Sequence, residues 1–369
     1  MLFRLLLHRD INRGLTVESQ QLTVTVGPGF SRANLEAAES LTMDAETNSA
    51  SRRDALLKLL RLGGLGAASA GLGIWLKARS HRPEARQAAN VQRNFTVPPD
   101  QNLPELVVAQ GEDPRELVRK ALGELGGIQR FISRGDVVVI KPNVAWDRVP
   151  EQAANTNPQV VAEMARLCRE AGAKKVIVTD VSCNEPRRCF QRSGIADAAR
   201  AAGAQVILPE ERNFKEVDLR GDFLGPWPVL EPFLAADKMI NIPIAKHHSL
   251  TGVTLGMKNW YGILGGQRNR LHQRIHESLA DLADFMRPTL TLMDAYRVLL
   301  RNGPTGGSLS DVALKKTLIA GTDPVALDAY AAKAYWDLDY HTLRYLKLAQ
   351  DRGLGIMNFE NVRTRVANV

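Results

Sequence analysis

Cysteine is scarce in this 369-residue sequence, and its spacing is unsuited to metal binding. Cys168, Cys183 and Cys189 form no C-x-x-C pair, so the clustered thiolates that hold iron–sulfur clusters or structural zinc are missing. We therefore expect no iron–sulfur cluster from the chain's own cysteines. Cys168 lies on a helical apolar stripe and is expected in the core. Cys183 and Cys189 fall in an expected loop, where a disulfide and two free thiols are both open.

Basic blocks interleaved with aromatic residues are also missing. Aromatic residues make up 6% of the chain, and the formal net charge is +8. The segment through Arg86 contains 12 basic and 8 acidic residues, so half of the positive excess lies there and the remainder of the chain is only mildly basic. Without a contiguous basic face, we expect no binding to nucleic acid.

A short apolar run near the N-terminus indicates export rather than a membrane span. Residues 1–42 show no sustained periodicity, and we expect them to be a non-native extension before a true start at Met43. Residues 51–58 (SRRDALLK) resemble the twin-arginine export signal, and residues 62–76 supply a Gly- and Ala-rich apolar core. This core is shorter than the about 20 residues of a membrane-spanning helix and has the proportions of a signal sequence.

The predicted domain order follows from that signal. Residues 43–80 form the twin-arginine-like segment, residues 81–100 a polar linker with prolines, and residues 101–369 one α/β domain. We expect a periplasmic or exported protein that uses the twin-arginine export machinery. No clean A-x-A cleavage site follows the apolar core, so an uncleaved signal that anchors the protein to the membrane is also open. The alternative is an ordinary amphipathic helix that happens to contain Arg52 and Arg53.

From Leu106 onward, short β-branched runs alternate with amphipathic segments, which is the pattern of an α/β protein. Residues 136–141 (DVVVIK) are typical of a strand buried on both faces of a parallel sheet. The predicted strands are 107–109, 136–141, 175–180, 205–208, 238–242, 289–293 and 318–321, and the predicted helices are 114–126, 158–172, 195–202, 271–286 and one from Pro324. This alternation predicts a doubly wound, mostly parallel sheet with helices on both faces.

Polar residues gather where several of these predicted strands end. Lys141 and Asn143 follow one strand, Asp180 a second, residues 246–248 (KHH) a third, and Asp294 a fourth. In an open parallel sheet, ligands bind in the crevice beyond the carboxyl ends of the strands. We therefore expect these side chains to converge on one rim.

At these residues the chain resembles the family named domain of unknown function 362 (DUF362). The resemblance covers roughly residues 137–355 and consists of seven motifs in order. The motifs are Lys141-Pro142-Asn143, Asn241-Ile242-Pro243, Lys246-His247-His248, Lys258-Asn259 with Gly262, Asp294, Gly303-Pro304 with Gly306-Gly307, and Gly321, Asp323-Pro324 and Asp328. Some relatives carry an added ferredoxin-like cysteine module, whose C-x-x-C runs are absent here, so the chain resembles the single-domain form.

Three lysines in these motifs indicate anion chemistry. Lys141, Lys246 and Lys258 can hold carboxylate or phosphate groups as point charges, or act as a base or imine former if burial lowers a pKa. The alternative is that each lysine pairs with Asp180, Asp294 or another carboxylate for structure. Three lysines in strand-end motifs favour the functional interpretation.

The histidines indicate proton transfer or metal ligation. The family pattern matches His248 better than His247, and it also matches His272. His272 and His276 are spaced i, i+4 on a predicted helix, a geometry that can chelate a divalent metal. A site formed by a subset of His248, His272 and Asp294 is therefore expected as a candidate metal centre, while no protease signature such as H-E-x-x-H or G-x-S-x-G is present.

The sequence thus predicts an exported α/β enzyme that acts on a small anionic substrate, with a divalent metal as a candidate cofactor. We assign catalytic roles to Lys246, His248, Lys258 and Asp294, ligand-binding roles to Lys141, Asn143, Asn259, Asp180 and Asp328, and metal-binding roles to His248, His272 and Asp294. Asp323 is expected to cap a helix, whereas Asp328 lies one turn inside it without an obvious capping role. The competing hypothesis is a non-catalytic ligand-binding or cofactor-handling protein of the cell envelope.

Overall fold

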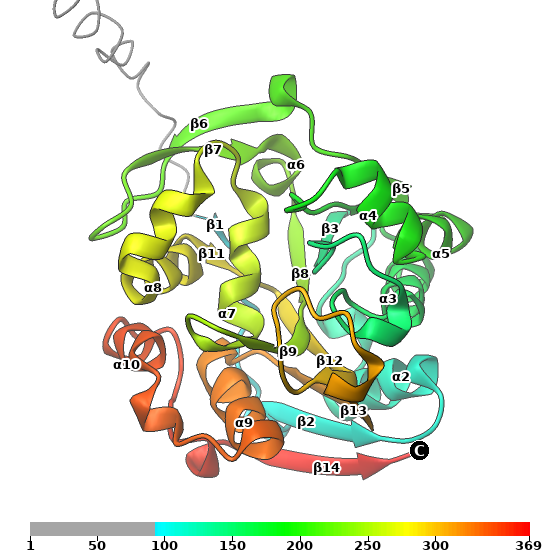
Figure 1. Cartoon of the computed structure of the whole chain (residues 1–369). Coiled ribbons are helices and arrows are strands. Elements are labelled where there is room, and N and C mark those ends of the chain that lie inside the picture. Colours follow the sequence, from blue (N-terminus) through cyan, green and yellow to red (C-terminus); the bar gives the residue numbers. More distant parts are fainter. Residues whose placement is uncertain (1–92) are drawn as a thin grey trace, which may run out of the picture. The chain divides into compact units, whose positions relative to one another are not determined.

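The computed structural model describes residues 93–369 (Figure 1). The expected N-terminal extension, the twin-arginine-like segment and most of the linker lie outside these described residues. Within the described range, no helix is long and apolar enough to cross a membrane.

A ten-stranded sheet forms the centre of the described region. Its strands are β2 (Leu106–Gln110), β3 (Val137–Pro142), β4 (Lys175–Val178), β5 (Gln205–Val206), β8 (Lys238–Ile242), β9 (Ile244–His248), β10 (Gly252–Thr254), β12 (Leu290–Leu299), β13 (Val312–Gly321) and β14 (Thr364–Asn368). The order is β14-β2-β13-β12-β8-β3-β4-β5, with β9 beside β12 and β10 beside β9. Only β13 with its two neighbours and the β9–β10 pair run antiparallel, so the sheet is mostly parallel, as predicted.

Helices cover both faces of this sheet, which confirms the predicted α/β class (Figure 1). One face carries α2 (Pro114–Glu124), α3 (Pro158–Glu170), α4 (Pro186–Arg192) and α5 (Ile195–Ala201), and the other carries α6 (Glu231–Leu234), α7 (Gly256–Asn259), α8 (Ile275–Phe285), α9 (Pro324–Trp336) and α10 (Arg344–Asp351). Along β3, Val138 and Ile140 pack into the first layer and Val139 into the second. This alternation explains the continuous apolar run, because both strand faces are buried.

Two smaller pairings lie outside the central sheet. Strand β1 (Arg93–Asn94) pairs with β11 (Met286–Arg287), and β6 (Phe214–Asp218) forms an antiparallel pair with β7 (Pro226–Leu230). The sequence did not predict these four strands, because they are short and lack the alternation of apolar and polar residues that marks longer strands.

Helix starts were predicted well where an Asx residue precedes proline. Asp113, Asn157 and Asp323 each cap a helix whose first residue is proline, and each side chain accepts a hydrogen bond from a first-turn backbone N–H. The predicted helix over residues 271–286 is instead two pieces, a 3-10 helix (Arg268–Arg274) followed by α8. The first piece is polar and buries only Leu271, so no apolar stripe holds it in α-helical geometry.

The order in which strands are added to the sheet changes sides at β3. The chain passes from β3 outward through β4 to β5, and then returns to place β8 on the opposite side of β3. In open α/β sheets, such a switch point leaves a crevice at the carboxyl ends of the two strands. The crevice here lies beyond Pro142 of β3 and Ile242 of β8.

Candidate functional site

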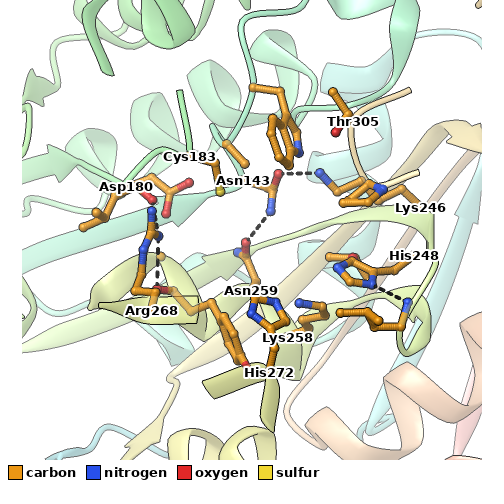
Figure 2. Close-up of a pocket in the computed structure, with 18 of the residues that line it drawn as sticks. Asn143, Asp180, Cys183, Lys246, His248, Lys258, Asn259, Arg268, His272 and Thr305 are labelled. Atoms are coloured by element: carbon orange, nitrogen blue, oxygen red, sulfur yellow. Dashed lines mark hydrogen bonds between the residues drawn. The ribbon is translucent and has the colours of Figure 1, made fainter. Parts of the chain in front are cut away.

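A cavity of about 520 Å³ opens at this crevice, and most of the predicted site residues line it (Figure 2). The predicted residues on its wall are Lys141, Asn143, Asp180, Lys246, His248, Lys258, Asn259 and His272. They come from β3, the loop after β4, β9, α7 and the 3-10 helix before α8. The convergence expected from the strand ends is therefore present for these positions.

Lys141 is held in a buried ion pair at the end of β3. Its Nζ lies 2.7 Å from Oδ1 of Asp180 and donates to the carbonyl of Pro142 at 3.1 Å. The second oxygen of Asp180 accepts from the backbone N–H of Val144 at 2.6 Å. Gly262 packs directly on this pair, and a methyl group there would collide with the Asp180 carboxylate. Burial lowers the pKa of Lys141, while the charge of Asp180 acts in the opposite direction.

Lys246 on β9 is equally buried but has no carboxylate partner among the described residues. Its Nζ donates to Oδ1 of Asn143 at 2.9 Å and to the carbonyl of Ala154 at 2.6 Å. Burial lowers the pKa of Lys246 to about 7, and the nearby charge of Lys258 acts in the same direction. A substantial share of this amine is therefore neutral near neutral pH.

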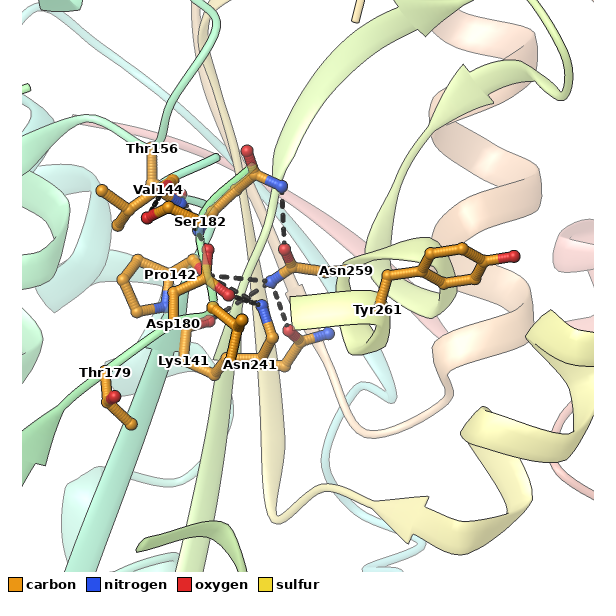
Figure 3. A network of polar contacts seen from close by, with 12 residues as sticks. Lys141, Pro142, Val144, Thr156, Thr179, Asp180, Ser182, Asn241, Asn259 and Tyr261 are labelled. Carbon is orange, nitrogen blue, oxygen red and sulfur yellow. Dashed lines mark hydrogen bonds and ion pairs between the residues drawn. The ribbon is translucent and has the colours of Figure 1, made fainter. Parts of the chain in front are cut away.

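A chain of asparagine amides, which includes Asn241 and Asn259 (Figure 3), fixes the Asn143 acceptor that faces Lys246 (Figure 2). Asn241 donates to the carbonyl of Gly256 at 3.0 Å and accepts from Asn259 at 2.8 Å, while Asn259 accepts from Asn143 at 3.0 Å. Because a backbone carbonyl can only accept, every amide in the chain has one possible orientation. The chain thus ends with the carbonyl oxygen of Asn143 pointing at Lys246.

Lys258 on α7 faces the cavity without a hydrogen bond from its Nζ to any described residue. The amine lies 4.4 Å from the centre of the Tyr261 ring, over its face, and the residue is 8% exposed. Burial lowers the pKa of Lys258 to about 8. This ammonium group is therefore available to a bound anion.

Comparison with known proteins places the chain in a family. Residues 138–333, more than half of the chain, match the family described as Domain of unknown function (DUF362). The chain belongs to the DUF362 family. The match includes every cavity residue that the sequence singled out, and it falls within the span expected from the motifs.

One curated relative of this DUF362 chain is a thylakoid-associated protein of Synechocystis sp., 28% identical over 219 residues. The alignment covers 57% of this chain and 66% of the relative, just under two thirds of its length.

Two solved structures are distantly similar. One is the lactate racemase apoprotein from Thermoanaerobacterium thermosaccharolyticum, with 15% identity, coverage of 61% of this chain and 55% of that chain, and a TM-score of 0.36. The other is a structural-genomics protein from Thermotoga maritima, with 14% identity, coverage of 66% and 60%, and a TM-score of 0.35. Neither likeness is close enough to transfer a function.

His248 in this DUF362 site is arranged as a hydrogen-bond donor. Its Nδ1 accepts from the backbone N–H of Leu250 at 3.1 Å (Figure 2), so the neutral ring carries its proton on Nε2. Burial lowers the pKa of His248 to about 3, and the charge of Lys258 adds to this effect. A neutral ring with Nε2–H can donate to a ligand, but its basic nitrogen is already used. The neighbouring His247 does not line the cavity and accepts from the N–H of Gly303 at 3.2 Å.

Asp294 and Asp328 were assigned to the site, but the structure places them outside the cavity wall. Asp294 accepts from the backbone N–H groups of Asn157 and Tyr296, at 2.7 and 3.0 Å. Asp328 accepts from those of Gly256 and Met257, at 2.7 and 3.1 Å. Both carboxylates therefore organise backbone, and Asp328 caps the first turn of α7 from a different helix.

Two of the three predicted metal ligands, His248 and His272, line the cavity, whereas Asp294 does not. Asp294 is buried behind the cavity wall, and the described residues contain no group of three or more His, Cys, Asp or Glu side chains that could hold a metal ion. His272 lies on the 3-10 helix, 5.5 Å from the Tyr261 ring, whereas His276 begins α8 and stacks on Tyr345 at 6.4 Å. The expected chelating pair fails because the α-helix that its spacing requires starts only at residue 275.

Several cavity residues carried no predicted role. Arg268 donates to the carbonyls of Val181 and Ser182, both at 2.7 Å, and so fixes the loop after β4. Thr254 lies opposite Lys246 on β10, and its hydroxyl is buried without a hydrogen-bond partner. The basic run around Arg268 was a weak signal in the sequence. Nothing in the sequence indicated a role for Thr254, because the β9–β10 pairing was not predicted.

The three cysteines differ in their exposure to solvent. Cys168 lies on α3 and is buried in the core, as predicted. Cys183 is exposed and lines the cavity, whereas Cys189 is buried, and all three thiols are free. Burial raises the pKa of Cys189 to about 11, so its thiol is inert near neutral pH.

Proposed function

We propose that this cavity binds a small anion and that the protein is an enzyme acting on it. The observation that carries the proposal is the charge balance of the wall: three cationic side chains, Lys141, Lys258 and Arg268, and the partly neutral amine of Lys246 share the cavity with a single carboxylate, that of Asp180. Because Asp180 pairs with Lys141, the excess positive charge lies at Lys258 and Arg268. An anion that enters would supply the missing negative charge in a poorly hydrated site, where charge pairing is strong.

The cavity wall offers hydrogen-bond donors and amines, whereas its one carboxylate, that of Asp180, is paired with Lys141. Lys258 is free to pair with the anion, His248 offers Nε2–H, and the partly neutral amine of Lys246 can accept a proton. Catalysis by Asp294 is not part of this proposal, since its oxygens are bound by backbone N–H groups. No step is assigned to a metal, because the three predicted ligands do not converge.

A non-catalytic binding protein of the cell envelope is the second candidate. It is favoured by the bonding of His248 Nδ1 and by the pairing of Asp180 with Lys141, which occupy the basic nitrogen of His248 and the one carboxylate on the cavity wall. The two functions differ in outcome, because an enzyme converts the anion it binds and a binding protein returns it unchanged. Mass spectrometry of the anion after incubation separates them.

We further propose export by the twin-arginine route, from the sequence of residues 51–76. The name of the thylakoid-associated relative is compatible with a protein that works at an energy-converting membrane. The test is a fusion of residues 43–98 to a reporter. Delivery to the periplasm should stop when Arg52 and Arg53 are both replaced by lysine, and unchanged delivery would defeat the proposal.

The anion proposal is tested by thermal unfolding with a panel of malonate, succinate, phosphate and sulfate. At least one anion at millimolar concentration should raise the Tm of the wild type by several degrees, because ligands that bind only the folded state stabilise it. Lys258→Gln should lose most of this increase while keeping its own unliganded transition. Lys174→Gln, a change at an exposed lysine outside the cavity wall, should respond like the wild type. Equal stabilisation of all three proteins would mean that anions bind elsewhere.

A further inference from the structure

The hydrogen bonds of Lys246 match a neutral amine rather than an ammonium group. Its Nζ donates to Oδ1 of Asn143 and to the carbonyl of Ala154, and no third acceptor is found in residues 93–369. An ammonium group has three N–H donors, whereas a neutral amine has two and one lone pair. The two acceptors therefore satisfy the neutral form and leave the lone pair for a molecule in the cavity.

The acceptors of Lys246 are fixed in place. Asn143 is the end of the amide chain that begins at the carbonyl of Gly256, so its oxygen cannot be exchanged for its NH₂ group without loss of at least one bond of the chain. Ala154 contributes a backbone carbonyl, which only accepts. The Nζ is thus held with a defined orientation, which a nucleophile requires.

The other two lysines of the cavity are placed differently. Lys141 donates to the Asp180 carboxylate at 2.7 Å, which favours its charged form. Lys258 has no fixed acceptor and lies over the Tyr261 ring, a position suited to a cation. Lys246, with neutral acceptors and a cationic neighbour, is the lysine whose surroundings favour the uncharged amine.

A second observation comes from Thr254, the register partner of Lys246 across the β9–β10 pair. Its side chain is 5% exposed and lines the cavity, and its hydroxyl has no partner. Side chains at directly paired positions of antiparallel strands lie on the same face, close together. A buried hydroxyl without a partner is costly, which indicates that a ligand oxygen beside Lys246 completes its bonding.

We propose that Lys246 forms an imine with the carbonyl carbon of a small oxo acid whose carboxylate is bound by Lys258. This inference rests on the proposed function, because the oxo acid is the anion that the cavity binds. The carbonyl oxygen lies within the reach of the Thr254 hydroxyl and of the Nε2–H of His248, the two neutral donors of this part of the wall.

The step balances without any further reactant. The lone pair of Nζ forms a bond to the carbonyl carbon as the C=O π pair moves to oxygen. Both N–H hydrogens of the neutral amine then leave with that oxygen as water, and the C=N double bond remains. Covalent attachment of this kind makes bonds adjacent to the former carbonyl carbon easier to break, because the imine accepts electrons once its nitrogen has taken up a proton from water.

Reductive trapping tests the proposal. The full-length protein is incubated with pyruvate, oxaloacetate or 2-oxoglutarate in the presence of cyanoborohydride, which reduces an imine to a stable amine. With at least one acid, the intact mass should increase by the mass of the oxo acid less one oxygen atom, and peptide mapping should place the adduct at Lys246. Lys246→Met should form no adduct, and Thr254→Val should form it several-fold more slowly while folding normally.

Malonate, which has no ketone, separates this inference from the proposed function. Lys246→Met should remain stabilised by malonate, which shows that its anion site is folded, and Lys258→Gln should lose both malonate stabilisation and trapping. Malonate stabilisation of the wild type without any adduct, or adducts spread over exposed lysines, would overturn the imine and leave the anion site standing. Absence of an adduct together with absence of stabilisation by every anion of the panel would overturn both.

Discussion

At the scale of single residues, the protonation of Lys258 should control anion affinity. Burial lowers the pKa of this lysine to about 8, and an anion pairs with its protonated form. Affinity should therefore be highest below pH 7 and fall by about tenfold per pH unit above pH 8, as one proton is lost. Calorimetric titration of the stabilising anion between pH 6 and pH 10 measures this slope.

The matched variant for this prediction is Lys258→Arg. Arginine stays charged throughout this range, so the variant should bind the anion with a much smaller decline above pH 8. An identical decline in both proteins would show that another group governs binding.

At the scale of elements, the short helix α7 is held in place by a residue of α9. Asp328 accepts hydrogen bonds from the first two backbone N–H groups of α7, and Gly256 leaves room for its carboxylate. Helix α7 in turn carries Lys258 and Asn259. Asp328 is therefore a positioning residue for the site.

Asp328→Asn should weaken both the fold and the site. The asparagine can accept only one of the two bonds, and its NH₂ group faces an N–H, so we expect a loss of about 1–3 kcal/mol in the free energy of unfolding in urea. Anion affinity should fall at least tenfold because α7 shifts. Asp323→Asn, which weakens the cap of α9 at its own first turn, should cost similar stability and leave affinity within about twofold. Equal losses of affinity would remove the positioning role.

The same elements show what the sequence could predict about the site. Lys141 and Asp180 follow strands buried on both faces, whose apolar runs are unmistakable, so their meeting at one crevice followed from the fold class. Lys246 and His248 were placed in the site through their motif, although strand β9 that carries them was not predicted. Asp294 was wrongly assigned to the cavity because its strand was predicted to end at residue 293, whereas β12 continues to residue 299.

Other contacts depend on tertiary structure alone. The amide chain through Asn143, Asn241 and Asn259 joins residues up to 116 positions apart, so no local sequence pattern predicts its hydrogen bonds. The capping role of Asp328 was missed for the same reason, since the helix it caps lies 72 positions away.

At the scale of the whole molecule, the buried charges should make stability depend on pH with a minimum near neutrality. Burial raises the pKa of Asp328 to about 7 and that of Asp294 to about 6, from an ordinary value of 3.8. These two carboxyl groups therefore bind more protons in the folded state than in the unfolded state between pH 4 and 7, which lowers stability as the pH rises. His248, whose pKa burial lowers to about 3, has the opposite effect over most of this range, so the expected fall is the part of the carboxyl effect that His248 does not offset. Lys246, with a pKa of about 7 instead of 10.5, also has this opposite effect, so stability recovers between pH 7 and 10.

Urea unfolding across pH 4–10 measures the free energy of unfolding along both limbs of this dependence, the fall up to pH 7 and the recovery above it. Each pKa difference of one between the folded and unfolded chain corresponds to about 1.4 kcal/mol, so each limb should amount to a few kcal/mol. Lys246→Met should reduce the alkaline recovery, with Lys258, whose pKa burial lowers to about 8, contributing to the part that remains, and Asp328→Asn should reduce the acid-side fall. A flat alkaline limb in the wild type would show that Lys246 remains charged in the fold.

The cationic cavity is the proposed anion site. Bromide tests it directly, because this spherical anion can bind a cationic site whatever the shape of the site's own ligand. Crystals of the protein soaked in bromide, measured at the bromine absorption edge, show directly where an anion collects. We predict an anomalous peak inside the cavity beside the Nζ of Lys258, and its loss in crystals of Lys258→Gln. Bromide bound only at surface residues, with none beside Lys258, would contradict the assignment of this cavity as an anion site.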